Sequence, residues 1–569
     1  MALGFGFTKP EPTIFARYRI SDNVGLLNIW WEPPLSAAQA MIQGGIATDW
    51  IAWGPSIFAI SLLFIAFFFF TSSIVLIFRR SWFDVEKIPF PLVLATYELT
   101  KVVQAKDEKS YGRERPFLIG ILLGFVFMVP LFMARTFPWF PDIYGWRSIA
   151  VCNAWKLPEN SPLSSIIGLG SVSVDPISVA LFFLAPLSIS FNVWFWTFVM
   201  YILDQIAFYM GYNTGGPGLS GWARVCCNTG PGAGPPFYWP NLGQLGGFVA
   251  LTVMFIFIHR GYVRETLRSA IHGSNPELEK DEALSYRSTY LMLVISAAMS
   301  LASLMIMGID FAAAIVTMLT SCFTTWFAMT LIFGMGGMGA SDRILWTTGY
   351  LRILWPDPST APTNLDYVMS HYFAENGQNE PNYVFGNGFY VTAQCLKMAS
   401  LTGASNRNTF LVAAVCWVVA IPVILASSVW SANLYGQRVL SGWGSCAIEN
   451  VCETSPALQA SRPASSLYLT YGIAGFVFTA LLSYMHARFV WFPFEPIGFV
   501  IATSFPGQSF GVWSAFLIAW IAKTIVLRTG GSSLYEKYAL PLVGGFITGV
   551  VLASMIGIIT GMVRFFIPF

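Results

Sequence analysis

The sequence predicts an all-α, polytopic membrane protein with roughly 10–14 membrane segments, some broken or re-entrant, in two pseudo-repeated halves. Of its 569 residues, 55% are hydrophobic and 11% are charged, whereas soluble domains carry about 25% charged residues. Apolar runs of about 20 residues recur, which is the length a helix needs to cross a bilayer. Two short apolar segments are interrupted by prolines at corresponding places. Runs this long are not barrel strands, so the spans are helices.

The expected spans follow one another along most of the chain. The clear candidates are residues 57–78, 117–134, 187–209, 248–258, 290–307, 311–333, 410–429, 467–485, 512–526 and 540–567. Shorter, ambiguous stretches are residues 89–103, 177–185, 388–401 and 495–505. The 248–258 run needs flanking residues to reach spanning length. Residues 177–212 must cross an even number of times but are too short for two full spans, so a re-entrant or broken-helix arrangement divided at Pro186 is expected.

The positions of lysine and arginine set the expected orientation. One basic cluster follows the first span, and a second lies within residues 259–287. We place both clusters in the cytoplasm, together with Lys523 near the last hairpin. The chain is then a multi-pass protein of the cell (plasma) membrane. The outer loops are rich in Gly, Pro and Trp and hold most cysteines. Cys446 and Cys452 are candidates for a short disulfide in an oxidising compartment; the alternative is that all cysteines are reduced.

The polar stretches divide the chain into four expected parts. Residues 1–50 form an N-terminal interfacial segment with tryptophans typical of headgroup level. Residues 51–340 form a first transmembrane half and residues 409–569 a second. Between them, residues 341–408 form a central polar segment that could include a membrane-associated helix.

Two proline-interrupted segments resemble each other. "RRSWFDVEKIPFPLVLATYELTK" (79–101) and "HARFVWFPFEPIGFVIATSFPGQ" (486–508) each follow a basic span end and break at prolines before a short apolar run with Ala-Thr. Such pairs are typical of transporter repeats with the site at the repeat interface. A helix that starts at a break can hold an anion on its free N–H groups. The alternative is two unrelated proline-capped helix starts. The expected half-helix breaks are Pro89, Pro91, Pro186, Pro493 and Pro496.

Polar side chains inside apolar segments are candidates for a solute pathway, because they are costly at membrane depth. Asn192, Asp204 and Gln205 lie in one apolar segment, and the spacing of the first two, about three turns, could place them on one helix face. Asp310 is a further pathway candidate at the hinge of two spans. The alternatives are that Asp204 is solvated near the outer interface and that Asp310 only forms a tight turn.

Glu98 and Glu495 flank the two proline breaks and are candidates for carrying a coupling proton. The alternative is helix-start capping by acidic side chains. In "GQLGGF", Gln244 could bond a partner helix, but close packing through Gly246 and Gly247 is favoured.

No pattern in the sequence predicts catalysis, a cofactor or a metal site. The four histidines do not form a ligand set by spacing. "GMGGMG" follows an apolar run and not a strand, so nucleotide binding is not expected. We therefore expect a protein that is not an enzyme and has no nucleic-acid partner. Its expected partners are the lipid bilayer and a small solute, and homo-oligomers or membrane-complex partners are left open.

Several motifs, taken together, point to a family. They are "FRRSWFDVEKIPFPLVLATYELTK", "PLSISFNVWFW", "GQLGGFVALTVMFIFIHRGYVRETLRSAI", "DEALSYRSTY" and "FPFEPIGF" followed by "WSAFLIAWIAKTIVLRTGGSSLYEKYALPLVGGFITG". The sequence resembles an uncharacterised prokaryotic family of polytopic membrane proteins that is similar to the oligopeptide-transporter superfamily. The resemblance covers most of residues 50–340 and 465–549. It implies a multi-helix fold of two related halves and secondary transport.

The sequence therefore predicts an oligopeptide-transporter-like secondary transporter, with proton-coupled uptake of a peptide-like or metal-chelate solute. The alternative is a non-transporting membrane scaffold or accessory subunit of a larger membrane or envelope complex, which the aromatic-rich outer loops favour. A transporter should have a polar cavity at mid-membrane reached by Asn192 or Asp204, whereas a scaffold should have a sealed core.

Overall fold

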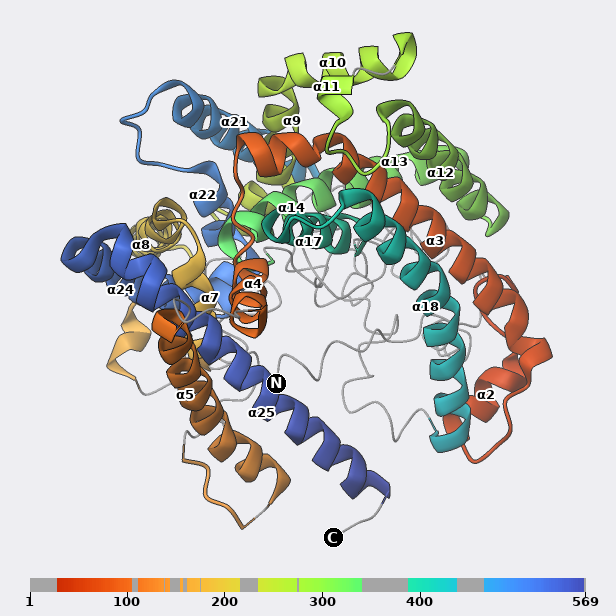
Figure 1. Ribbon diagram of the computed structural model, residues 1–569, viewed down its shortest axis with the longest axis horizontal. Coiled ribbons are helices and arrows are strands. Elements are labelled where there is room, and N and C mark those ends of the chain that lie inside the picture. Colours follow the sequence, from red (N-terminus) through yellow and green to blue (C-terminus); the bar gives the residue numbers. More distant parts are fainter. Residues whose placement is uncertain are drawn as a thin grey trace. The chain divides into compact units, whose positions relative to one another are not determined.

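The computed structural model (Figure 1) describes residues 28–104, 111–137, 139–143, 154–156, 161–173, 175–214, 234–273, 276–339, 387–436 and 465–566. Within these ranges nearly all regular structure is helical. The one sheet found there pairs two short antiparallel strands, β1 (Ala154–Lys156) and β2 (Ser171–Ser173). The predicted all-α class is confirmed for the described part of the chain.

The same ranges contain nine stretches that are long and apolar enough to cross a membrane. They are Trp50–Val85, Glu114–Ala134, Leu187–Tyr209, Asn241–Ile258, Tyr286–Ile306, Phe311–Gly336, Asn406–Tyr435, Ser466–Arg488 and Val512–Val563. The last stretch joins α24 (Val512–Leu534) to α25 (Leu540–Phe566) through a π-helical turn. The short run at 248–258 reaches spanning length because another π-helical turn, Asn241–Gly247, precedes α9 (Phe248–Ile258). The predicted polytopic membrane architecture is confirmed.

The chain divides into two compact units, each assembled from separate stretches of sequence. Unit 1 comprises Met1–Lys87, Leu245–Thr330 and Ser341–Phe476. Unit 2 comprises Ile88–Gln244, Leu331–Ala340 and Val477–Phe569. Two helices, α14 (Thr325–Gly336) and α21 (Ser465–Arg488), contribute residues to both units. The four-part sequential division expected from the sequence stays a prediction.

Unit 1 is built around one long central helix. Its helices are α2 (Leu35–Gln43), α3 (Trp50–Arg80), α9, α10 (Arg260–His272), α11 (Pro276–Glu279), α12 (Tyr286–Ile306), α13 (Phe311–Thr317), α17 (Asn387–Thr402) and α18 (Asn406–Tyr435). The central helix α3 packs against α12, α17 and α18. It begins at Asp49, whose carboxylate accepts the N–H groups of Ile51 and Ala52 and so caps the helix start. Apolar side chains cover α3 all round, as expected of a helix inside a bundle.

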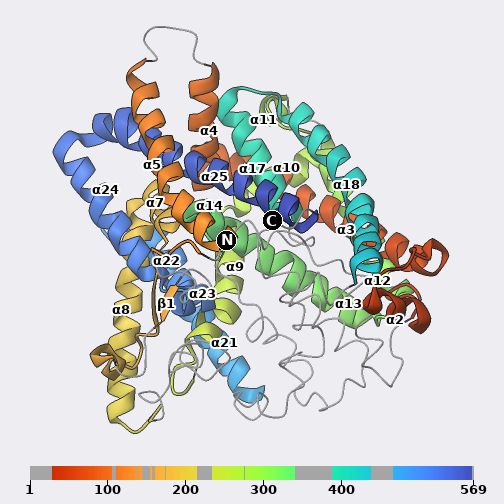
Figure 2. The same ribbon diagram turned by 90° about the horizontal axis from the view of Figure 1, so that it is seen from below.

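Unit 2 contains the helices that start at proline breaks. The helices that lie within unit 2, whether or not they start at a proline, are α4 (Pro91–Gln104), α5 (Tyr111–Thr136), α7 (Pro176–Leu184), α8 (Leu187–Tyr209), α22 (Pro496–Thr503), α23 (Phe505–Ser509), α24 and α25. The most extensive packing joins α5 to α25 (Figure 1, Figure 2). Glycines allow the two helices to approach closely. A Cβ on Gly124 would collide with the Phe546 carbonyl, and a Cβ on Gly549 would collide with the Ile121 carbonyl.

Proline begins helices where the sequence suggested half-helix breaks. The helices α4 and α22 start at Pro91 and Pro496, and α8 starts directly after Pro186. Proline fits a first helical turn because its missing N–H has no partner there anyway. Pro89 and Pro493 lie just before two of these starts. Between Pro89 and Pro91, the Phe90 N–H donates to the Gly334 carbonyl at 2.8 Å and fixes the entry to α4.

Candidate functional site

The starts of two helices in unit 2 meet around a buried amide and a buried carboxylate. The Asn192 side chain, on α8, is fully buried, and Glu495, directly before α22, is 6% exposed. The Asn192 Nδ2 donates to the Ser188 carbonyl and to the Pro493 carbonyl, each at 2.9 Å. The Ser188 hydroxyl donates to Glu495 Oε2 at 2.9 Å. We name Ser188, Asn192, Pro493 and Glu495 the α8–α22 cluster.

The α8–α22 cluster has spare hydrogen-bonding capacity. The Asn192 Oδ1 atom is buried and has no hydrogen-bond partner, which is costly for an amide unless something else satisfies it. The Glu495 carboxylate makes no capping bond to its own helix and instead reaches the first turn of α8, where the helix dipole favours an anion. The arrangement therefore offers an unused acceptor beside a carboxylate.

A second buried carboxyl lies further along α8. Asp204 is 2% exposed, and its Oδ1 accepts the indole N–H of Trp239 at 2.9 Å. The nearby Tyr201 hydroxyl is buried without a hydrogen-bond partner. Gln205 faces another neighbour, because its Oε1 accepts the Ile167 N–H at 3.0 Å.

The structure does not bring Asn192 and Asp204 together. Twelve residues rotate an α-helix by about 120°, not by a whole number of turns. Both side chains are buried, but Asn192 contacts the segment before α22 whereas Asp204 contacts Trp239. The expected shared face is therefore wrong in detail, although both residues point into the interior of unit 2.

The break between α7 and α8 holds a buried lysine. Lys523, on α24, is 8% exposed, and its ammonium donates to the Ala185 carbonyl at 2.7 Å. The ammonium also lies 4.7 Å from the centre of the Tyr535 ring. The sequence predicts a cytoplasmic charge near the last hairpin at this position, whereas the structure buries the lysine side chain within α24. Its position within the run "WIAKTIVL" was the available signal.

The remaining carboxylate candidates differ in setting. Glu98 is buried on α4, and its Oε1 lies 2.7 Å from the ammonium of Lys101. Asp310 belongs to unit 1, is exposed, and caps α13 by accepting the Ala312 N–H at 3.0 Å. Asp310 thus caps a helix start between α12 and α13, whereas the alternative expected for it was a tight turn.

Unit 1 contains a charge cluster that sequence reasoning missed. The Arg79 guanidinium, at the end of α3, contacts both carboxylate oxygens of Glu282, at 2.7 and 2.9 Å. It also contacts Asp84 at 3.1 Å. The Tyr286 hydroxyl donates to Glu282 at 3.4 Å. Burial raises the pKa of the Glu282 carboxyl, and Arg79 offsets only part of that rise. The two residues stand 203 positions apart, so no local pattern pairs them.

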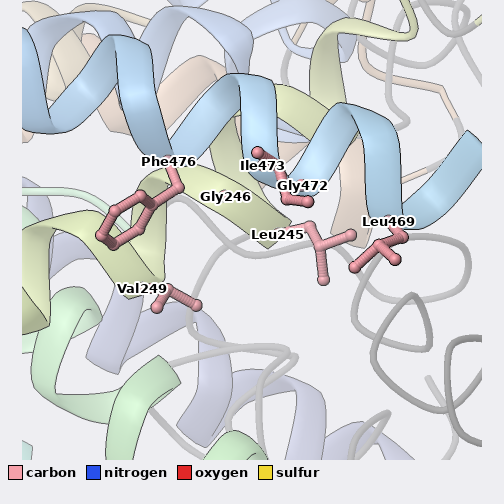
Figure 3. Close-up of a pocket in the computed structure, with 7 residues that line it drawn as sticks. All are labelled: Leu245, Gly246, Val249, Leu469, Gly472, Ile473 and Phe476. Atoms are coloured by element: carbon pink, nitrogen blue, oxygen red, sulfur yellow. The ribbon is translucent and has the colours of Figure 1, made fainter.

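A pocket of about 240 Å³ in unit 1 is almost wholly apolar (Figure 3). It is lined by Leu245, Gly246, Val249, Leu469, Gly472, Ile473 and Phe476. The lining includes none of the predicted pathway residues. Gly246 packs directly on the backbone of Gly472 and Phe476, because a Cβ there would collide with both. This contact agrees with the expected use of the "GQLGGF" motif in close helix packing.

The structure describes only some of the cysteines and potential metal ligands. Cys446 and Cys452 lie outside the described residues. Cys322, Cys395 and Cys416 are free thiols. Within the part of the chain that the structure describes, no group of three or more His, Cys, Asp or Glu side chains is placed to hold a metal ion.

Comparison with known proteins places the chain in a family without giving an activity. No curated protein matches the sequence. A family model described as "Family of unknown function (DUF6785)" matches residues 25–567, which is nearly the whole chain. The match covers both units and all of the candidate site. The chain therefore belongs to the DUF6785 family, a family of unknown function.

Proposed function

We propose that this protein is a proton-coupled secondary transporter of the plasma membrane that takes up a peptide-like or metal-chelate solute. The observation that carries the proposal is the α8–α22 cluster, where two proline-started helices meet around Asn192 and Glu495. Broken helices with polar groups at the break are how secondary transporters build solute sites inside the membrane.

The chemistry of the cluster suits a solute that carries amides and charge together. The unpartnered Asn192 Oδ1 is an acceptor for a peptide-type N–H donor. The Glu495 carboxylate can bind a cationic amino group or a proton.

Asp204 is our candidate for the coupling proton alongside Glu495 and Glu98. It lies within a candidate span and contacts a neutral indole donor. Carboxyl groups at membrane depth commonly form the proton relays of transporters. The motifs that resemble the oligopeptide-transporter superfamily add support, and because fold-level analogy does not establish an activity, the test must be functional.

The experiment is uptake of labelled di- and tripeptides, and of a labelled metal chelate, into proteoliposomes with an imposed proton gradient. We expect gradient-driven uptake by the parent and a loss of at least tenfold in Asp204→Asn. The matched control is Asp310→Asn, because Asp310 is exposed and Asn is also a good helix cap. Uptake that Asp204→Asn leaves unchanged would remove Asp204 from the pathway but keep transport.

One observation favours the alternative of a non-transporting scaffold. Asn192 and Asp204 are 0% and 2% exposed, so the structure holds them in sealed packing, as a scaffold would. In a transporter this packing corresponds to an occluded conformation that must open during transport. Absence of uptake for all solutes, from folded protein, would favour the scaffold.

A further inference from the structure

The helix α10 begins where a candidate membrane span ends. The span Asn241–Ile258 finishes with α9, and α10 starts at Arg260. The Arg260 guanidinium fixes the corner, since it donates to the Phe257 carbonyl at 2.9 Å and lies 4.5 Å from the centre of the Phe257 ring. The first turn of a helix that starts directly after a span lies close to the membrane surface.

One side of α10 packs against another helix of unit 1. The Tyr262 hydroxyl lies 3.0 Å from that of Tyr286, and the Thr266 hydroxyl lies 3.0 Å from that of Tyr290. Both tyrosine partners belong to α12, against which α10 packs. These contacts fix which faces of α10 remain available to the surroundings.

The available surface combines an apolar edge with a basic stripe. Leu267 and Ile271 are 43% and 68% exposed. Arg264 and Arg268 are exposed beside them, and within the described residues neither guanidinium forms an ion pair. At about 100° per residue, Arg264 and Arg268 lie within about 60° of Ile271, and the acidic Glu265 lies about 60° from Arg268 on the side away from Ile271.

We propose that α10 is an interfacial helix that binds anionic phospholipid headgroups. Leu267 and Ile271 would enter the boundary between headgroups and acyl chains, and Arg264 and Arg268 would bind the lipid phosphates. A helix with a basic face, an apolar edge and a place at the end of a span has the properties of membrane-surface helices. Arginine suits this task because its planar guanidinium binds phosphate through two parallel hydrogen bonds. The proposal is independent of any transport activity.

The test measures lipid binding to the full-length protein in mixed micelles by native mass spectrometry. The probes are phosphatidylglycerol and phosphatidylcholine with identical acyl chains. Each surface arginine contributes about fivefold to anionic-lipid affinity, so Arg264→Gln/Arg268→Gln should weaken phosphatidylglycerol binding about 25-fold and leave phosphatidylcholine binding unchanged. The matched control, Arg264→Lys/Arg268→Lys, keeps both positive charges at the same positions and should keep most of the phosphatidylglycerol affinity.

Two further arms separate the outcomes. Inorganic phosphate at constant ionic strength should not displace the lipid, and displacement would show a phosphate site and overturn the headgroup proposal. Ile271→Ser keeps the charge and should weaken both lipids about threefold through lost burial of the side chain. Parent affinity in the arginine double variant, or equal loss in the control, would also overturn the proposal.

Discussion

Arg79 and Asn192 show two ways in which this apolar chain buries a polar side chain. The Arg79 guanidinium is matched by the two oxygens of Glu282 and by Asp84. The Asn192 amide uses both its donor contacts on carbonyls and leaves Oδ1 without a partner. Fully paired groups hold a structure together, whereas buried groups with spare capacity are candidates for binding a ligand. Single-residue changes should therefore act on stability in the first case and on function in the second.

The first prediction concerns the Arg79–Glu282 pair. Replacing Glu282 with Met leaves a buried guanidinium with its main partner removed, and should lower the free energy of unfolding by about 3–5 kcal/mol. The double variant Arg79→Met/Glu282→Met removes both charges and should recover most of that loss. Denaturation in mixed micelles measures the free energy of unfolding of the parent, of the single variants Glu282→Met and Arg79→Met, and of the double variant. Additive losses in the double variant would contradict a coupled pair.

The second prediction concerns pH and His259. Burial alone would lower the pKa of His259, but its contacts with Glu86 and the Phe255 carbonyl outweigh burial and raise it. The pKa of histidine in the unfolded state is about 6.5. Because the pKa in the folded state is higher, protonated His259 stabilises the fold below about pH 6.5, and this stability is lost as the pH rises through the folded-state pKa. The contribution should be about 1 kcal/mol or less, because Glu86 is 46% exposed.

The measurement for His259 is the free energy of unfolding from pH 5.5 to 8.5. The parent should lose stability relative to His259→Gln as pH rises through this range. The control is His272→Gln, since His272 is an exposed histidine at the end of α10, and it should keep the parent's pH dependence. A parent and a His259→Gln variant with parallel pH profiles would refute the prediction.

At the scale of elements, unit 2 depends on close helix packing and on helices that start at prolines. The α5–α25 contact relies on glycines that let carbonyl groups of the partner helix approach. The α7–α8 break relies on Lys523, whose ammonium donates to the buried Ala185 carbonyl. Both features suit a membrane protein, because a backbone N–H or C=O group without a hydrogen-bond partner costs free energy in lipid.

The third prediction tests the α5–α25 contact. Gly549→Leu forces a side chain against the Ile121 carbonyl and should lower the free energy of unfolding by about 1–3 kcal/mol or more. Gly561→Leu on the same helix is the matched control, because a Cβ at Gly561 meets no atom within 4 Å. Thermal unfolding in detergent compares the two, and equal midpoints would contradict the packing account.

Local patterns predicted the elements well but not the contacts between them. The run at 57–78 identified α3, although the helix starts earlier at Trp50 because Asp49 caps it. Prolines marked the starts of α4 and α22 because their effect on the backbone is local. By contrast, the partners of Arg79 and Asn192 lie 203 and 301 residues away, and hydrophobic periodicity contains no such information. Lys523 was misplaced for the same reason, since a lysine near a span end looks like a topology signal until its burial is known.

At the scale of the whole molecule, the central claim is that solute movement is coupled to protons through buried carboxyl groups in unit 2. A scaffold needs neither an unpartnered amide at a helix break nor carboxyl groups inside apolar segments. Coupling predicts that adding solute drives protons across the membrane even without an imposed gradient. It also predicts that neutralising a coupling carboxyl abolishes proton movement while solute binding survives.

The most direct measurement is solute-driven proton entry into proteoliposomes that contain a pH-sensitive dye. For a transported peptide or chelate, the parent should acidify the lumen in proportion to uptake. Glu495→Gln and Asp204→Asn are assayed in parallel with the Asp310→Asn control. Coupling through these carboxyl groups predicts acidification by the parent and the control, and its loss in at least one of the two buried-carboxyl variants. Uptake without any proton entry would contradict the coupling, and neither uptake nor proton entry from folded parent protein would contradict transport itself.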